Sequence, residues 1–173
     1  MANVHNGHAL QHTAAHQLTP HIRLAMPADV QRIFAIRTSV VENHLSMPQL
    51  AELGITEQAV LELIDAQDCT WVAEAAGQLL GFAIIVLAEA CVFALFVEPQ
   101  HEGQGTGSAL LHQAEQRLFQ THTRIWLETS IDSRAAQLYQ HRGWQIETLL
   151  PISSEGSSAG LQDAVFVKHR PAA

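Results

Sequence analysis

The sequence predicts a single α/β domain, and three observations support this fold class. Seven stretches with strand character are interspersed with amphipathic stretches of helix length. Hydrophobic residues make up 47% of the 173 residues, which is typical of a packed globular protein of one domain. A glycine-rich turn stands between an apolar strand and an amphipathic helix. The predicted order is β, α, α, β, β, β, α, β, α, β, β.

Residues 1–20 differ from the rest of the chain, because they are polar and rich in histidine. We predict a disordered tail here, followed by one domain at residues 21–173. His8, His12 and His16 would share one face of a helix and could then hold a metal. So short an isolated helix is marginal in water, so a mobile tail without metal is the simpler interpretation.

The first half of the domain combines helix and strand signals. Residues 21–25 predict a strand, Pro27 suits a first helical position, and helical spacing of apolar residues continues to about Glu42. After a connection with one short turn, Thr56 can cap a second helix. Two strands then follow, joined around Gly77 as a hairpin.

The second half contains a near-continuous apolar run, "ACVFALFVE", at residues 90–98. This pattern predicts a strand buried on both faces. After Pro99 come Gly103, Gly105 and Gly107, and then an apolar-faced helix. The remaining elements are a strand at 124–129, a helix from about Ser133 to Arg142 that Gly143 ends, and two closing strands at 144–152 and 162–170.

The glycine turn predicts an anion site, because bare backbone N–H groups and a helix N-terminus together attract phosphate groups. It is not a P-loop, since no Lys-Ser/Thr pair follows Gly107. A dinucleotide fingerprint would need its third glycine at Ser108. The turn also resembles the S-adenosylmethionine loop of class I methyltransferases, but that loop usually opens its domain, whereas here only about two strand–helix units follow.

Two motifs resemble those of the GCN5-related N-acetyltransferases (GNAT). The first is Val97-x-Pro99 followed by the glycine turn and its helix. The second is "LETSIDSRAAQLYQHRGW" at 127–144, similar to L-x-V-x-x-x-N-x-x-A-x-x-L-Y-x-x-x-G-F. The exit of the first helix, "IRTSVVENHLS", is similar to an element of one bacterial subgroup. The resemblance covers residues 22–168 and implies a mixed, mostly antiparallel sheet of about seven strands with flanking helices and a splay between strands 4 and 5.

The resemblance implies acetyl-CoA as cosubstrate, with its pyrophosphate on the loop amides and its pantetheine arm paired with the backbone of residues 95–97. Glu102 stands where the family usually has Arg or Gln, and a carboxylate there should repel the pyrophosphate unless it faces solvent. Asp132 and Ser133 compete for the position of the family's Asn. The predicted cofactor residues are Leu95, Phe96, Val97, Glu102, Gly103, Gln104, Gly105, Thr106, Gly107, Ser108, Asp132, Ser133, Arg134 and Ala135.

Acetyl transfer to an amine needs a neutral amine and a proton or hydrogen bond for the leaving thiolate. Tyr139, the single tyrosine of the chain, stands at the position of the family's usual general acid; the alternative is an ordinary core tyrosine. For the base, Glu128 and Glu89 are both candidates. Either could instead be a solvated carboxylate at a strand end, and a water relay without an essential base is also open.

The predicted function is therefore transfer of an acetyl group from acetyl-CoA to a primary amine of a small molecule. Arg37, Glu42 and Asn43 lie where the first helix should flank the thioester, so they are the predicted acceptor residues, unless they form only a solvated helix end. The alternatives are a protein or peptide N-terminus as acceptor, or a non-catalytic acyl-CoA-binding sensor module.

Composition restricts the partners. The formal net charge of −8 argues against a nucleic-acid partner. No run of residues has the length of a membrane span, and no signal peptide is evident, so no membrane partner is expected. Cys69 and Cys91 lie in apolar surroundings and are interpreted as reduced core thiols of a cytoplasmic protein. The family analogy leaves a homodimer open.

Overall fold

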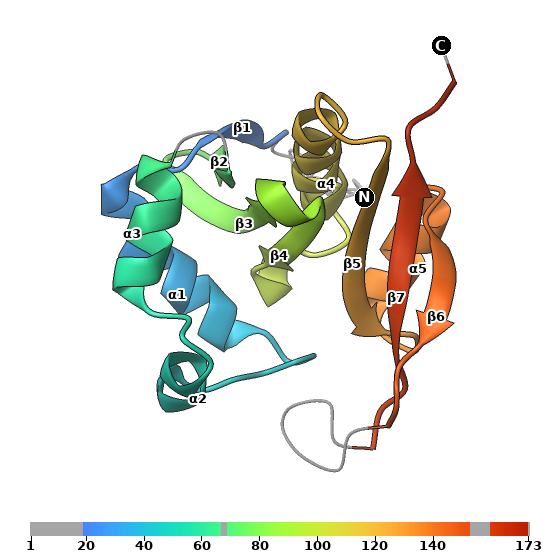
Figure 1. Ribbon diagram of the computed structural model, residues 1–173. Helices are drawn as coiled ribbons and strands as arrows, with labels where there is room; N and C mark the ends of the chain where they lie inside the picture. The colour runs from blue at the N-terminus through green and yellow to red at the C-terminus, as the bar shows by residue number, and fades with distance from the viewer. Residues whose placement is uncertain (1–18, 67–68, 153–159, 173) are drawn as a thin grey trace, which may run out of the picture.

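A mixed sheet of seven strands, ordered β1-β2-β3-β4-β5-β7-β6, organises the chain (Figure 1). The computed structural model describes residues 19–66, 69–152 and 160–172, so His8, His12 and His16 of the predicted tail lie outside the described residues. β4 and β5 pair in parallel and the other neighbours are antiparallel, which confirms the predicted sheet. The strands are β1 (His21–Leu24), β2 (Thr70–Ala75), β3 (Gln78–Val86), β4 (Cys91–Val97), β5 (Arg124–Ser130), β6 (Gln145–Leu149) and β7 (Asp163–His169).

Helices cover the two faces of this sheet unequally. The helices are α1 (Val30–Ser39), α2 (Met47–Glu52), α3 (Glu57–Asp65), α4 (Thr106–Leu118) and α5 (Arg134–His141), with 3-10 turns η1 (Pro27–Asp29), η2 (Leu87–Glu89) and η3 (Pro99–His101). Because side chains alternate along a strand, Val72 packs with the cluster of α1 to α3, whereas Trp71 packs with that of α4 and α5. Among the described residues, no helix has the length and apolar character needed to cross a membrane.

Capping residues define several helix ends as the sequence predicts. The Thr56 hydroxyl accepts a hydrogen bond from the Ala59 N–H, 3.2 Å away, at the start of α3. Ser133 caps α5 in the same way, and Gly143 has the left-handed φ of 83° expected after its last turn. α2 is a full helix where only a turn was predicted, because Ser46 and Gln49 form a capping box.

α1 ends at Ser39, three residues before the predicted end. Ser39 donates its hydroxyl to the Ile36 carbonyl, and Val40 is extended, with ψ of 148°. Two β-branched residues in succession, Val40 and Val41, favour that extended conformation. The segment that follows therefore leaves the helix axis and crosses toward the centre of the sheet (Figure 1).

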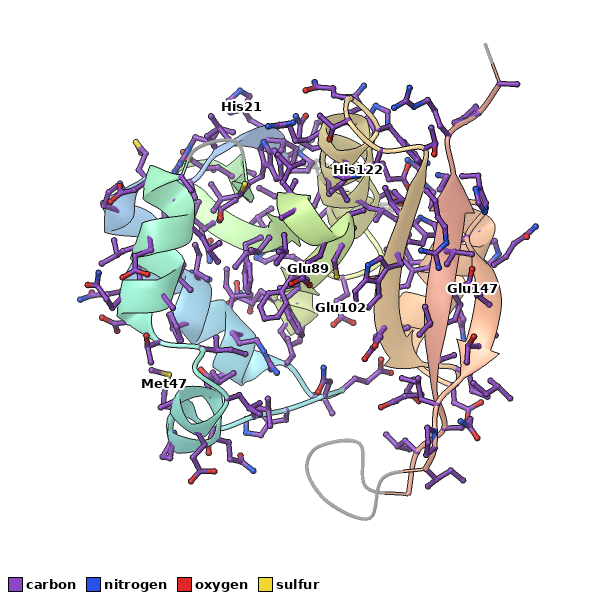
Figure 2. The ribbon with its side chains drawn as sticks, viewed as in Figure 1. His21, Met47, Glu89, Glu102, His122 and Glu147 are labelled. Carbon is purple, nitrogen blue, oxygen red and sulfur yellow. The ribbon has the colours of Figure 1, made fainter. Side chains whose placement is uncertain are left out.

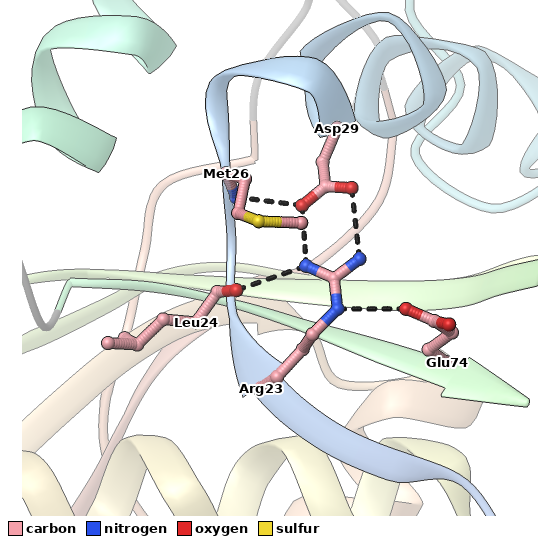
Figure 3. A network of polar contacts seen from close by, with 5 residues as sticks. All are labelled: Arg23, Leu24, Met26, Asp29 and Glu74. Carbon is pink, nitrogen blue, oxygen red and sulfur yellow. Dashed lines mark hydrogen bonds and ion pairs between the residues drawn. The ribbon is translucent and has the colours of Figure 1, made fainter. Parts of the chain in front are cut away.

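Arg23 joins the first strand to the first helical turn (Figure 3). Its guanidinium donates two hydrogen bonds to Asp29, at 2.7 and 3.1 Å, and one to Glu74, at 2.8 Å. Burial tends to raise the pKa of Asp29, but the hydrogen bonds from Arg23 and from the Met26 N–H lower it on balance. The carboxylate is thus kept charged, and the start of α1 is held against β1 and β2.

A buried network fixes the helices behind the other half of the sheet. Both carboxylate oxygens of Glu115 on α4 accept from Lys168 of β7 at 2.8 Å. The Trp144 indole N–H donates to the same carboxylate at 2.7 Å, and the Trp144 N–H donates to the Tyr139 carbonyl. Since the charge of Glu115 is paired and hydrogen-bonded, its burial is tolerated, and α4, α5 and β7 are fastened together.

β4 and β5 share a single residue pair, Cys91 with Trp126, and then part. This confirms the predicted splay. The prediction that β4 is buried on both faces is wrong, because only Cys91 and Val92 are buried and Phe93 is 49% exposed. The apolar side chains beyond the contact with β5 line cavities instead of packing between two layers.

On its other side β4 lies unusually close to β3 at Gly81. A Cβ on Gly81 would lie 2.7 Å from the Phe96 carbonyl oxygen and 3.2 Å from the Val97 Cα. Both contacts are backbone atoms, which cannot move without displacing the strand. Gly81 therefore permits the position of the β4 segment whose other edge faces the splay.

We predict that Gly81→Ala lowers the free energy of unfolding by about 1–3 kcal/mol, because overpacking must shift β4. Chemical denaturation measures this. Gly107→Ala is the matched control, since the nearest atoms to its Cβ are the ends of side chains: Leu138 at 3.3 Å, Val97 at 3.7 Å and Leu95 at 3.8 Å. The control should change stability by less than about 1 kcal/mol, with the preference of helices for Ala offsetting the contact. Equal losses in the two variants would contradict the backbone argument.

Candidate functional site

The parting of β4 and β5 is accompanied by two adjoining cavities. The smaller, of about 500 Å³, lies along β4 and extends to the glycine turn and α5. The larger, of about 950 Å³, lies under α1 and α3 and reaches β5 and β7. Glu42, Glu128 and Ser133 are among the residues that line both cavities. The two spaces therefore adjoin at these residues, and molecules bound in each could come into contact there.

Most of the predicted cofactor residues line the smaller cavity. Those that do are Leu95, Phe96, Val97, Glu102, Gly103, Gly105, Gly107, Ser108, Ser133, Arg134 and Ala135. Gln104, Thr106 and Asp132 do not line it. Thr106 is buried at the start of α4, Gln104 donates to the Gln100 carbonyl, and Asp132 lines the larger cavity instead. Of the two candidates for the family's Asn position, only Ser133 thus reaches the smaller cavity.

The glycine turn has the geometry of an anion cradle. Gly103 and Gly105 have φ of 71° and 88°, a left-handed conformation that favours glycine, and a Cβ on either would have no neighbour within 4 Å. The backbone is therefore accessible at the mouth of the smaller cavity, directly before the 13-residue helix α4. Free N–H groups and the positive end of the helix dipole suit a pyrophosphate, so the residues present fit acetyl-CoA.

Glu102 is paired across the mouth of the smaller cavity. Its carboxylate accepts from the Arg134 guanidinium at 2.6 Å, and Figure 2 labels Glu102 in this region. The Arg134 backbone N–H in turn donates to the Glu42 carboxylate at 3.0 Å. The negative charge of Glu102 beside the anion cradle is thus offset by a nearby cation. No local sequence pattern indicates this pair, because 32 residues separate its partners.

Tyr139 lies on α5 with its ring in the core and also lines the smaller cavity. Its ring centroid lies 5.9 Å from that of Trp144 and 6.3 Å from that of Phe166. Burial raises the pKa of Tyr139 well above its ordinary value. The hydroxyl therefore stays protonated at neutral and mildly alkaline pH and is available as a hydrogen-bond donor.

The two glutamates proposed as bases occupy different positions. Glu128 lies on β5 beyond the contact with β4 and lines both cavities. Glu89, which Figure 2 labels, is exposed in η2, just before the point where β4 meets β5. It is not among the described residues that line either cavity. The Glu89 carbonyl accepts from the Trp126 indole at 2.8 Å. The arrangement thus favours Glu128 over Glu89 as the carboxylate nearest the point where the cavities meet.

Arg37, Glu42 and Asn43 all line the larger cavity. Arg37 is only 7% exposed, donates to the Asn43 carbonyl at 2.9 Å, and lies 4.4 Å above the Phe96 ring. Asn43 adopts the left-handed φ of 54° that asparagine tolerates better than most residues. Arg37 therefore fixes the segment after α1 to β4, and Glu42 and Asn43 are the more accessible groups.

Comparisons with known proteins agree with this geometry. Residues 66–146 match the family model described as an acetyltransferase (GNAT) domain. No curated protein matches the chain.

Solved structures share the fold at low sequence identity. Ard1 from Thermoplasma volcanium is 20% identical, with a TM-score of 0.70, covering 88% of this chain and 98% of that one. The ribosomal-protein-S18-alanine N-acetyltransferase from Escherichia coli is 21% identical, with a TM-score of 0.67, covering 89% of this chain and 96% of that one. YncA from Salmonella typhimurium, a putative acetyltransferase solved with acetyl-CoA, is 17% identical. Its TM-score is 0.68, and the match covers 87% of this chain and 94% of that one. Residues 66–146 thus match an acetyltransferase (GNAT) domain, and the chain has the fold of these solved structures.

Proposed function

We propose that the protein transfers the acetyl group of acetyl-CoA to a primary amine of a small molecule bound in the larger cavity. The observation that carries this proposal is the position of Glu128, on the wall of both cavities. A volume of about 950 Å³ falls within the range of small-molecule sites. Likeness to a ribosomal-protein acetyltransferase at 21% identity is one of fold, so it does not favour a protein acceptor.

Acetyl-CoA supplies the acetyl group as a thioester, and the chain positions it. The amides of the glycine turn and the N-terminus of α4 bind the pyrophosphate. The edge of β4 at Leu95–Val97 pairs with the pantetheine arm in the manner of an added strand, because β5 has already parted from it. Ser133 and Arg134 form the opposite wall. Glu42 and Asn43 contact the acceptor from the far side.

The proton transfers follow from this placement. Glu128 takes the proton of the acceptor ammonium, which leaves a neutral amine to attack the thioester carbonyl. The new C–N bond forms as the C–S bond breaks. Tyr139 donates its proton to the departing sulfur, and the second proton, which the acylated nitrogen must lose, restores the Tyr139 hydroxyl.

Tyr139→Phe should keep acetyl-CoA affinity and lower kcat by about 100-fold or more, the lower end of the range for general acid catalysis. Isothermal titration measures the affinity, and CoA release measures kcat. Because Phe retains the ring between Trp144 and Phe166, the fold should be kept. Unchanged turnover would remove Tyr139 from the mechanism.

Glu128→Gln and Glu89→Gln form a matched pair that tests the base. We expect Glu128→Gln to lower kcat/KM at neutral pH by about 100-fold, with partial recovery as the pH rises and more of the acceptor becomes neutral. Glu89→Gln should stay close to the unmodified protein. Loss of activity in Glu89→Gln alone would reverse the assignment, and full activity in both would favour a water relay.

A further inference from the structure

The larger cavity is lined by both acidic and apolar side chains. Among the described residues, four carboxylates and one guanidinium line it: Glu42, Glu128, Asp132 and Asp163, and Arg37. The apolar residues include Phe34, Phe82, Phe93 and Phe96. Such a cavity repels an anionic acceptor and attracts a cationic one that also carries apolar surface.

Three polar side chains of the cavity already make contacts within the chain. Arg37 donates to the Asn43 carbonyl and lies over the Phe96 ring. Glu42 accepts from the Arg134 backbone N–H at 3.0 Å. His44 contacts the Val40 carbonyl through Nδ1, 3.2 Å away. The carboxylates on the β5 and β7 side therefore determine what the cavity attracts.

Asp163 is the notable member of this group. Its Oδ1 is shielded from solvent, yet it has no hydrogen-bond partner among the described residues. Most buried polar atoms are hydrogen-bonded, because leaving one unpaired costs free energy. Asp163 as a residue is partly exposed and lines the larger cavity, so its negative charge attracts a cation that enters there.

Strand register sets the spacing between Asp163 and the proposed base. Asp163 on β7 pairs with Ser130 on β5, and Glu128 lies two residues before Ser130. Residues two apart on a strand, and residues directly opposite on an antiparallel neighbour, project from the same face. Glu128 and Asp163 are therefore diagonal neighbours on one face, about 7–8 Å apart.

We propose that the acceptor is a diamine or polyamine, with its reacting amine at Glu128 and a second ammonium group bound by Asp163 and Asp132. The methylene spacer between the two nitrogens packs against the phenylalanine side chains that line the cavity. This inference rests on the proposed function, because it assigns the acceptor of the same site. It adds what the reaction itself does not require, namely a second positive charge at a fixed distance from the first.

Matched amines test the proposal. CoA release is measured at saturating acetyl-CoA with 1,4-diaminobutane against butylamine, and with 1,5-diaminopentane against pentylamine. We expect kcat/KM for each diamine to exceed that of its monoamine by roughly tenfold or more, the factor for one charge-assisted hydrogen bond. Titration of 1,4-diaminobutane into the CoA-bound protein gives a binding readout that does not depend on turnover.

Asp163→Asn should weaken diamine binding and lower kcat/KM for 1,4-diaminobutane far more than for butylamine, so that most of the diamine preference is lost. Asp132→Asn should do the same to a smaller extent, because Asp132 is exposed. Asp65→Asn, at the exposed end of α3 and outside both cavity walls, is the matched control and should keep the preference.

The outcomes distinguish a failure of the diamine assignment from a failure of the proposed function. Equal use of diamine and monoamine, or an unchanged preference in Asp163→Asn, would overturn the diamine assignment and leave the acetyltransferase in place. A peptide used in preference to both amines would also overturn it. If no amine releases CoA although acetyl-CoA binds, the proposed function fails, and the acceptor assignment fails with it.

Discussion

The structure depends on one constraint, the parting of β4 and β5 after a single residue pair. The Trp126 N–H donates to the Ala90 carbonyl at 3.0 Å, and beyond this contact β4 has β3 alone beside it. Gly81 allows β3 to hold β4 closely on that side. Behind the sheet, α4 and α5 belong to one core cluster that spans both halves, and Glu115 fastens α4 to β7. The splay is therefore a fixed feature of the packed domain.

Each part of the candidate site takes its place from this geometry. The glycine turn follows the end of β4 that lies farthest from the β5 contact, so the anion cradle lies at the mouth of the smaller cavity. Glu128 lies on β5 beyond the contact, where both cavities reach it, whereas Glu89 lies before it and reaches neither. In the proposed reaction, the same separation of strands provides the site of the donor and of the acceptor, and it favours Glu128 over Glu89 as the base.

The sequence predicted the elements whose signals are local. Thr56, Ser133 and Gly143 mark helix ends through contacts within a few residues, and the structure has them in those roles. The exposure of β4 could not be predicted, because a strand packed on both faces and a strand that lines cavities have the same apolar sequence pattern. The two turns of capped helix in α2 were too short to stand out by periodicity.

The candidate site was predictable to the extent that motifs carry it, and not where distant residues meet. The glycine turn and Tyr139 have fixed spacing within their motifs. The Glu102–Arg134 pair and the Asp163 carboxylate beside Glu128 depend on tertiary placement and strand register. In the sequence, Gly81 is a glycine within a predicted strand. Such a glycine indicates that another group comes close to the backbone, but it does not indicate which group.

Hydrogen exchange with and without acetyl-CoA tests the central claim most directly, since it reports on individual backbone amides. We expect slower exchange at Leu95–Val97 and at residues 103–107 when acetyl-CoA is bound. The amides of β6 (Gln145–Leu149), on the outer strand that carries Glu147 (Figure 2), should be unchanged. Binding that left residues 95–97 and 103–107 unprotected would contradict the claim that the splay and the glycine turn hold acetyl-CoA.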